Sequence, residues 1–372
     1  MQTRRELLGT TAAALLSSAA PKIANAEWRN RQPGMAYRRL GRTGYMISEM
    51  VMGGNAIAPD NYEHVLLAAD MGLNYLDTAP AYGQGKSETA YSHVFKARKR
   101  DSFFLNSKVS PWDINRNNLY RDIFRSLPET ERKKLEGEAA EDVARRKAEQ
   151  PDYFGDYFPG QRAELYDSAL ANVMEKTYGR QIDREKNYKQ LILDSVDQTL
   201  SRTGAGHLDL LMCPHGANSP YELLNYPEIF EAFEILKKAG KVRYLGVSAH
   251  TDPAGILRAA VDVKQYAVAM VAYNIVNHGW VDPLLDRAYR ADLGVIAMKV
   301  ARPVYGGRND GKPDDPARIK LIRDAVPGSL KIPQKAYLWA LRNPRLSGVI
   351  SELVNASMVR DNLPLAAEKK PA

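Results

Sequence analysis

The sequence predicts an α/β fold, a (β/α)8 barrel with a β-hairpin in front of it. From residue 49 onward, short apolar runs typical of buried strands alternate with segments whose apolar residues recur at helical spacing. Eight such pairs follow in one repeating order. This order is typical of a parallel sheet with right-handed crossovers, and eight units can close into a barrel. An open, doubly wound sheet is the alternative, but the first strand lacks a following GxGxxG turn.

The first 26 residues are typical of an export signal and not of the fold. Residues 3–8 contain a twin-arginine pair, residues 10–20 are apolar, and residues 24–26 form a small-x-small cleavage site. A membrane anchor is the alternative, but the apolar stretch is shorter than the ~20 residues that a spanning helix needs. We therefore expect a twin-arginine signal, passage through the twin-arginine export machinery, a periplasmic location and no stable membrane insertion.

Composition excludes several classes of function. The net charge of +8 is spread along the chain without a run of like charges, so no nucleic-acid-binding arm is indicated. The single cysteine, Cys213, excludes a disulfide within the chain and a cysteine-ligated iron–sulfur cluster. The six histidines form no cluster with ligand spacing, so no metal site is expected.

The elements are expected in a simple order. A polar N-terminal arm (27–36), expected to be loose, precedes the barrel region (37–372), which opens with a hairpin of 37–40 and 45–47 around a glycine-containing turn. The expected barrel strands are 49–52, 73–76, 103–105, 208–213, 242–248, 267–273, 294–299 and 347–350. The expected helices are 62–71, 87–98, 188–202, 226–239, 254–263, 282–290, 332–342 and 356–363, with Ser87 as the N-cap of the second.

A long segment interrupts this order after the third strand. Residues 110–181 exceed a usual connection of about 4–6 residues, and we interpret them as an insertion. They contain a charged helical stretch at 129–150 and then two similar aromatic tetrapeptides, DYFG and DYFP, at 152–159. The segment is either a solvated insertion without a role or a lid or subunit contact. Its aromatic side chains either stack on a sugar-like ring or simply pack: Trp112, Tyr153, Phe154 and Tyr157.

Four polar side chains follow successive strands where those strands end. Asp77 ends the second strand, Tyr82 lies in the next loop, Lys108 ends the third and His215 follows the fourth. In a barrel these ends meet at one face. A lysine cation favours a neighbouring phenolate and lowers the tyrosine pKa, while a carboxylate keeps that lysine charged and a histidine orients a carbonyl oxygen. Each residue alone has an ordinary structural explanation, but together they predict a tyrosine general acid–base.

The motifs around these residues resemble the aldo/keto reductase family. The matching segments are 37–44, 47–48, 72–83 with 87–88, 107–109 and 241–248. The resemblance runs from residue 37 to residue 362 apart from the insertion. It implies hydride transfer from NADPH to an aldehyde or ketone, protonation by Tyr82, and supporting roles for Asp77, Lys108 and His215.

His215 departs from the family pattern by one residue. The family histidine usually lies five residues after the aspartate of the fourth strand, whereas Asp209 plus five is Pro214. A slip of one residue reverses the side to which a strand residue points. We therefore expect a β-bulge at Pro214 that restores the orientation of His215.

The resemblance also assigns cofactor contacts for NADP(H) or NAD(H). The assigned positions are Gly54, Asn55, Ser248, Met298, Lys299 and Asn362. Other positions differ from the family pattern in ways that remove polar contacts: Ala249, Met270, Val354 and Met358. His250 and His278, which lie near strand ends, are candidate pocket residues.

Two hypotheses of function follow. The first is an exported NAD(P)(H)-dependent oxidoreductase acting on a small-molecule carbonyl or the matching alcohol, with its cofactor bound tightly before export. The second is a barrel that has lost nicotinamide binding and acts as a ligand-binding or non-redox protein. The substrate itself cannot be deduced from these residues.

Overall fold

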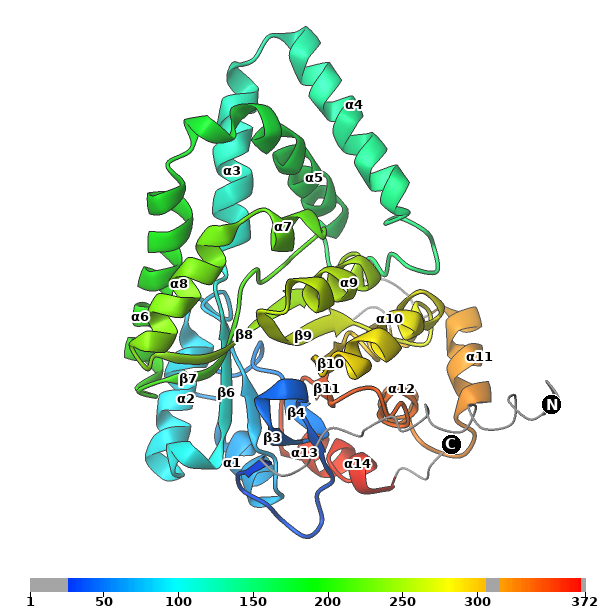
Figure 1. The fold of residues 1–372 in the computed structure, drawn as a ribbon. Coiled ribbons are helices and arrows are strands. Elements are labelled where there is room, and N and C mark those ends of the chain that lie inside the picture. The colour runs from blue at the N-terminus through cyan, green and yellow to red at the C-terminus, as the bar shows by residue number, and fades with distance from the viewer. Residues whose placement is uncertain (1–25, 306–314, 369–372) are drawn as a thin grey trace, which may run out of the picture.

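A closed barrel of eight parallel strands forms the centre of the molecule (Figure 1). The computed structural model describes residues 26–305 and 315–368, so the expected signal lies outside the described residues except for Ala26. The strand order is β10-β11-β4-β5-β6-β7-β8-β9. The predicted barrel is confirmed, and the open sheet is wrong. The strands are β4 (Met50–Met52), β5 (Tyr75–Asp77), β6 (Phe104–Lys108), β7 (Leu208–Met212), β8 (Val242–Ala249), β9 (Tyr266–Ala272), β10 (Gly294–Met298) and β11 (Gly348–Ser351).

Helices follow the strands on the outside of the barrel, close to the expected positions. They are α1 (Glu63–Asp70), α2 (Lys86–Ala97), α6 (Leu191–Thr203), α7 (Tyr221–Leu224), α8 (Pro227–Lys238), α9 (Pro253–Val263), α10 (His278–Arg290), α11 (Pro316–Ala325), α12 (Ile332–Leu341), α13 (Ala356–Asn362) and α14 (Leu365–Glu368). The predicted N-cap at Ser87 is wrong. Helix α2 begins at Lys86 after Gly85, whose positive φ of 87° suits glycine, and the Ser87 hydroxyl is instead hydrogen-bonded to that of Thr78. No helix in the described part of the chain combines the length and the apolar character that crossing a bilayer requires.

Successive side chains along each barrel strand point alternately inward and outward, so the hydrophobic core of the barrel consists of two clusters. Side chains such as Tyr75, Phe104 and Met212 form one buried cluster with the hairpin residues Tyr45 and Ile47. Their neighbours along the strands belong to a second cluster that packs against the surrounding helices. Because successive strand residues point to opposite faces, the first cluster fills the barrel and the second joins it to its helices.

The N-terminal hairpin forms as expected, but the arm before it is not loose. Strands β2 (Tyr37–Arg39) and β3 (Tyr45–Ser48) pair antiparallel, and β1 (Glu27–Trp28) adds to β3 in parallel. The next residue, Arg29, is buried and places its guanidinium 3.0 Å from the Asp209 carboxylate. A buried ion pair therefore anchors the arm, which its polar composition did not indicate.

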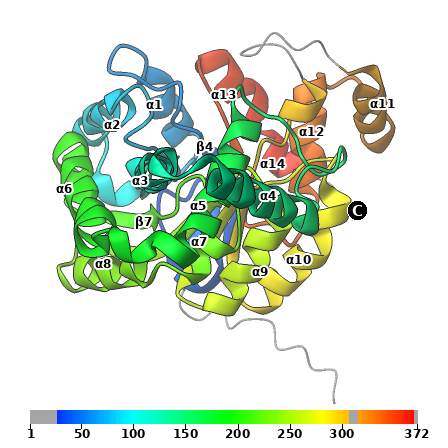
Figure 2. The same cartoon turned by 90° about the horizontal axis from the view of Figure 1, so that it is seen from above.

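Between β6 and β7 the chain builds three helices above one end of the barrel (Figures 1 and 2). The expected helix at 129–150 is α4 (Glu129–Arg146), and α3 (Pro111–Ser126) and α5 (Gln161–Tyr178) were not predicted. The three helices share a small apolar core of their own. A π-helical turn (Glu185–Gln190) then leads into α6.

Candidate active site

A buried ion pair lies where β5 and β6 end. The Lys108 Nζ atom is 2.6 and 2.7 Å from the two carboxylate oxygens of Asp77. Both side chains are almost fully buried, at 1% and 2% exposure. Asn106 adds a hydrogen bond to Asp77, and Lys108 donates another to the Thr78 carbonyl oxygen. The Lys108 ammonium is therefore enclosed by oxygen acceptors.

Burial shifts the pKa values of this pair away from the charged forms. Removal from water raises the pKa of Asp77 and lowers the pKa of Lys108. Their mutual attraction and hydrogen bonds oppose both shifts. The close two-oxygen contact is the geometry that keeps such a pair ionised, because each charge is the nearest compensation for the other.

Tyr82 extends this pair toward the mouth of the barrel. Its hydroxyl accepts a hydrogen bond from Lys108 at 3.1 Å, and the side chain remains partly exposed. The expected lowering of its pKa is wrong, because burial and the nearby Asp77 carboxylate raise the pKa of Tyr82 well above its usual value. Asp77 already neutralises the lysine charge that was expected to favour the phenolate. Tyr82 is therefore a neutral phenol, a form that donates a proton.

His215 lies beside Tyr82, beyond the last paired residue of β7. The two rings are edge to face with centroids 6.2 Å apart. Strand β7 ends at Met212. Beyond it, Cys213 N–H donates to the Gly246 carbonyl oxygen and Ala217 N–H to that of Ser248, so the chain advances four residues here against two on the side of β8. These extra residues lie where the bulge at Pro214 was expected. Burial, assisted by the positive charge of Lys108, lowers the pKa of His215 to about 3, so its ring is neutral. The structure thus brings together the four residues predicted from the strand ends.

An aromatic strap, defined here as residues 153–158, crosses the mouth. The Tyr153 hydroxyl donates to Asp252 after β8, at 2.8 Å. The Tyr157 hydroxyl accepts from Asn274 after β9, also at 2.8 Å, and its carbonyl oxygen accepts from Arg302 after β10. The strap is therefore attached to the loops of three neighbouring strands at the same end as the ion pair.

The aromatic side chains expected to stack on a ligand are mostly used for packing. Those of Trp112, Tyr153, Phe154 and Tyr157 are buried. Phe158 is partly exposed and lies edge to face against His250, with ring centroids 5.2 Å apart. Burial and the charge of Lys299 lower the pKa of His250 well below its usual value. His250 therefore lies at the site as expected, whereas His278 pairs with Asp282 on α10.

The sequence matches the family model described as the aldo/keto reductase family at residues 49–137 and 157–371. The match covers most of the chain. The chain belongs to the aldo/keto reductase family. Residues 138–156, the end of α4 and the start of the strap, lie between the two matched parts.

Known members of this family of oxidoreductases share the fold at low sequence identity. The oxidoreductase YqkF of Bacillus subtilis is 20% identical over 360 residues, which is 90% of this chain and 92% of the relative. An aldo-keto reductase from Bacillus halodurans, AKR11C1 in its holo form, superposes with a TM-score of 0.58 at 20% identity over 91% of this chain and 92% of that one. One from Klebsiella pneumoniae in complex with NADPH gives 0.56 at 16% identity, over 91% and 92% of the two chains.

The predicted cofactor positions of this aldo/keto reductase lie mainly at the mouth. Ser248 and Met298 are buried at the ends of β8 and β10. Lys299 follows with a positive φ of 57°. Burial lowers its pKa and so does the charge of Arg302, whereas the Glu352 carboxylate opposes this shift more strongly than Arg302 adds to it. An anionic group such as a dinucleotide phosphate would be attracted here by two cations and repelled by one carboxylate.

The remaining predicted cofactor residues lie in different surroundings. Gly54 packs tightly against β5, because a Cβ there would lie 2.0 Å from the Asp77 carbonyl oxygen. The Asn55 amide lies 3.5 Å from the Glu352 carboxylate, which sequence reasoning missed and which opposes an anion at this point. Asn362 is buried at the end of α13, outside the barrel, where α13 packs against α1.

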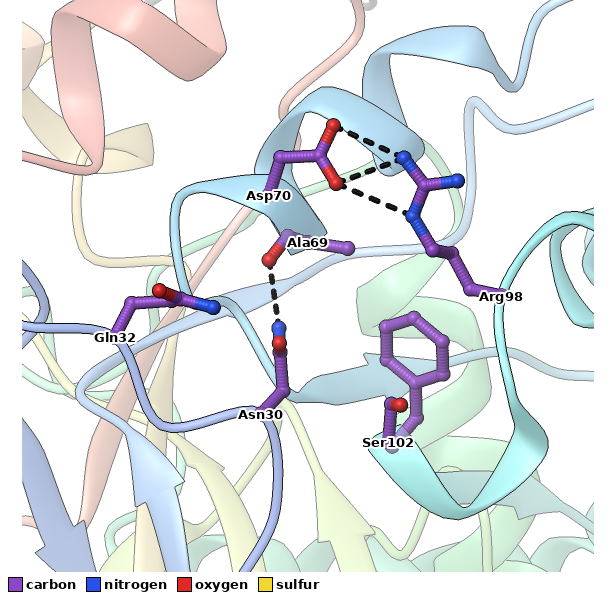
Figure 3. A pocket seen from close by; sticks show the side chains of 7 residues that line it. Asn30, Gln32, Ala69, Asp70, Arg98 and Ser102 are labelled. Atoms are coloured by element: carbon purple, nitrogen blue, oxygen red, sulfur yellow. Dashed lines mark hydrogen bonds and ion pairs between the residues drawn. The ribbon is translucent and has the colours of Figure 1, made fainter.

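A polar pocket of about 150 Å³ lies where the barrel strands begin, at the end opposite the ion pair. It is lined by the N-terminal arm, the residues before β6 and the ends of α1 and α2, among them Asn30, Asp70 and Arg98 (Figure 3). Asp70 and Arg98 pair with each other across it. The described residues include no group of three or more potential metal ligands. The strand ends around Asp77 therefore remain the candidate active site.

Proposed function

We propose that the protein is an NAD(P)(H)-dependent oxidoreductase that reduces the carbonyl group of a small molecule, or oxidises the matching alcohol, with Tyr82 as general acid–base. The hydrogen bond from the Lys108 ammonium to the Tyr82 hydroxyl carries this proposal. It places a neutral proton donor at the barrel mouth, beside a cation that can stabilise the anion left after transfer.

The nicotinamide, when bound, supplies or accepts the hydride. The Tyr82 hydroxyl donates its proton to the carbonyl oxygen, and Lys108, 3.1 Å away, stabilises the phenolate that remains. Asp77 keeps Lys108 charged inside the protein. The neutral His215 ring beside Tyr82 is placed to donate a hydrogen bond that orients the same oxygen.

The dinucleotide would be held by the ends of β8 and β10 and by α13. Lys299 would contact a phosphate, Ser248 the carboxamide and Asn362 the adenine. The charges of Lys299 and Arg302 support this arrangement, and the Glu352 carboxylate near Lys299 opposes it. The holo form of the Bacillus halodurans protein and the NADPH complex of the Klebsiella pneumoniae protein support a nicotinamide cofactor.

We also propose export through the twin-arginine route to the periplasm, with the cofactor bound before export. The support is the sequence pattern of residues 1–26. Replacing Arg4 and Arg5 by Lys should leave the protein in the cytoplasmic fraction. Equal periplasmic recovery of the variant and the unaltered protein would exclude this route.

A binding titration combined with one substitution tests the proposed function. NADPH and NADH are titrated into the purified protein, whose four tryptophans report binding by fluorescence. Reduction is then assayed with a panel of aldehydes and ketones. Tyr82→Phe should leave cofactor binding unchanged and lower kcat by about 10²–10⁴-fold, the usual contribution of a general acid. Tyr289→Phe, at a side chain 42% exposed on α10, is the control and should leave both unchanged.

The second candidate, a barrel without nicotinamide binding, is favoured by Glu352, whose carboxylate lies near the expected cofactor contacts. It predicts no saturable fluorescence change with either dinucleotide and no nucleotide retained in the purified protein. That outcome would reject the reductase proposal. Saturable binding with loss of turnover in Tyr82→Phe would reject the second candidate.

A further inference from the structure

The loop that carries His215 depends on a side chain from outside the barrel strands. Asp113 lies in the first turn of α3, five residues after Lys108. Its Oδ2 atom accepts hydrogen bonds from the backbone N–H groups of His215 and Gly216, at 3.1 and 3.2 Å. The junction of β6 and α3 therefore supports both sides of the candidate proton donor Tyr82. Lys108 hydrogen-bonds to Tyr82 itself, and Asp113 holds the backbone of the neighbouring His215.

The rest of the loop is anchored in a different way. Before His215, Cys213 N–H donates to the Gly246 carbonyl oxygen, and after it Ala217 N–H donates to that of Ser248. Between these two bonds the chain advances four residues while β8 advances two, so the regular pairing of β7 with β8 is interrupted there. His215 and Gly216 lie between them and use the carboxylate of Asp113 in place of a neighbouring strand.

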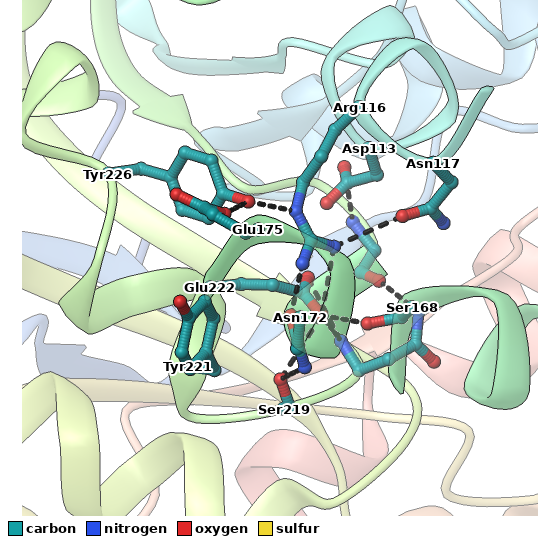
Figure 4. A network of polar contacts seen from close by, with 12 residues as sticks. Asp113, Arg116, Asn117, Ser168, Asn172, Glu175, Ser219, Tyr221, Glu222 and Tyr226 are labelled. Carbon is teal, nitrogen blue, oxygen red and sulfur yellow. Dashed lines mark hydrogen bonds and ion pairs between the residues drawn. The ribbon is translucent and has the colours of Figure 1, made fainter. Parts of the chain in front are cut away.

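A second buried carboxylate completes the support of the loop (Figure 4). Glu222 on α7 accepts from the Asn218 N–H at 3.2 Å and from the Ser168 hydroxyl of α5. Asn172, also on α5, donates to the Ser219 hydroxyl at 2.9 Å. Side chains of α3 and α5, the helices between β6 and β7, thus hold both ends of the segment from His215 to Ser219.

We propose that Asp113 is a positioning residue, which fixes the His215 loop so that the imidazole faces Tyr82 and a bound carbonyl oxygen. Its contacts are to backbone N–H groups and not to the reacting atoms, so it acts through His215. The inference rests on the proposed oxidoreductase function, and it gives the helices after β6 a role in the site.

Loss of the Asp113 carboxylate should disturb only the loop around His215. Without it, two backbone donors in a partly buried loop lose their acceptor, and the loop must rearrange or admit water to satisfy them. Misplacement of a catalytic group by about 1 Å can lower the rate about 10²-fold. The strand pairing on either side is unaffected, so we expect the barrel and the cofactor contacts to survive.

Four variants and one control test the proposal: Asp113→Ala, Asp113→Asn, His215→Ala, the double variant of Asp113→Ala with His215→Ala, and Asp122→Ala. Asp122 lies on the same helix with its side chain 75% exposed, so its replacement should change nothing. Hydrogen–deuterium exchange of peptides spanning 213–217 measures protection of the two amides without any cofactor. Steady-state kinetics with NADPH and the best carbonyl of the panel then give kcat, and fluorescence gives the dissociation constant of NADPH.

We expect Asp113→Ala to speed exchange at residues 215 and 216 and to lower kcat about 10–100-fold, with NADPH affinity unchanged within about twofold. Asp113→Asn should recover most of the activity, because its amide oxygen still accepts both hydrogen bonds. Because Asp113 acts through His215, the double variant should be no slower than His215→Ala alone.

Several results would overturn the proposal. Unchanged exchange in Asp113→Ala would show that the carboxylate does not hold the loop. Faster exchange with unchanged kcat would show that the loop position is irrelevant to the reaction. Multiplicative effects in the double variant would show that Asp113 acts independently of His215. If the unaltered protein neither binds NADPH nor turns over any carbonyl, the oxidoreductase function fails and the positioning role fails with it, while the exchange data still decide whether Asp113 holds the loop.

Discussion

Replacing Asp77 by Asn removes one charge from the buried pair and leaves the Lys108 ammonium enclosed without its counter-ion. The change keeps the shape of the side chain. Only neutral acceptors then remain for Lys108: the new amide oxygen, the Thr78 carbonyl oxygen at 2.8 Å and the Tyr82 hydroxyl at 3.1 Å. Breaking a buried pair in this way usually costs about 3–5 kcal/mol of unfolding free energy.

The lysine has one way to reduce this cost, and it makes the effect depend on pH. A neutral Lys108 needs no counter-ion, but deprotonating a lysine of normal pKa ~10.4 at pH 7 costs about 4.6 kcal/mol, at 1.36 kcal/mol per pH unit. The variant should therefore lose at most about 5 kcal/mol at pH 7. A lysine pKa lowered in the folded state means that the unfolded state binds more protons, so stability rises with pH. The variant should recover up to about 1.4 kcal/mol per pH unit between pH 7 and 10.

Urea denaturation at pH 7, 8 and 9 measures this, with two companion variants. Asp70→Asn breaks the Arg98–Asp70 pair, whose side chains are 41% and 56% exposed, and should cost less than about 1 kcal/mol. The double variant of Asp77→Asn with Lys108→Met removes both buried charges and should recover most of the loss at pH 7. The reasoning fails if Asp77→Asn costs no more than Asp70→Asn, or if the double variant is as unstable as Asp77→Asn alone.

Three further predictions concern the proton donor, the strap and the loop support. Because the pKa of Tyr82 is raised well above its usual value, the rate of carbonyl reduction should not fall up to about pH 10. The rate of alcohol oxidation should instead rise with pH. Initial rates measured in both directions check this. Gly155→Ala would place a Cβ 2.0 Å from the Tyr157 ring and should cost about 1–3 kcal/mol in urea denaturation, whereas Gly137→Ala, with open space around it on α4, should be neutral or stabilising. Burial, together with the charge of Glu222, raises the pKa of Asp113 to about 7 in the folded protein. The folded state then binds more protons than the unfolded state between about pH 4 and 7, so the stability that protonated Asp113 contributes should be lost as pH rises through this range. The urea midpoint of Asp113→Asn should lack this part of the pH dependence.

The barrel and the grouping of the candidate site residues could be predicted from the sequence because both depend on local signals. A short apolar run that stops at Asp77 or Lys108 reveals a strand end, and parallel strands bring their ends together. The N-cap at Ser87 was wrong because a glycine two residues earlier allows the left-handed backbone from which α2 starts. Local sequence does not decide between two such nearby candidates.

The pKa of Tyr82 could not be predicted because its direction depends on two distant charges and on burial. The sequence indicates that a lysine is near, which alone would lower the pKa. The structure shows that Asp77 neutralises that lysine and that enclosure of the phenol dominates. The same limit applies to Asp113 and Tyr157, whose partners lie 102 and 117 residues away along the chain and carry no local signal.

For the proposed reaction, the charges of the four central residues predict which direction is faster. Asp77 and Lys108 cancel, and Tyr82 and His215 are neutral, so the group as a whole carries no net charge before reaction. Proton donation from Tyr82 creates one negative charge, which lies next to Lys108 and is stabilised there. Oxidation of an alcohol must begin from that charged state, which burial disfavours. If the proposed reaction is correct, we therefore expect carbonyl reduction to be faster than alcohol oxidation near neutral pH, and alcohol oxidation to require a pH high enough to form the phenolate.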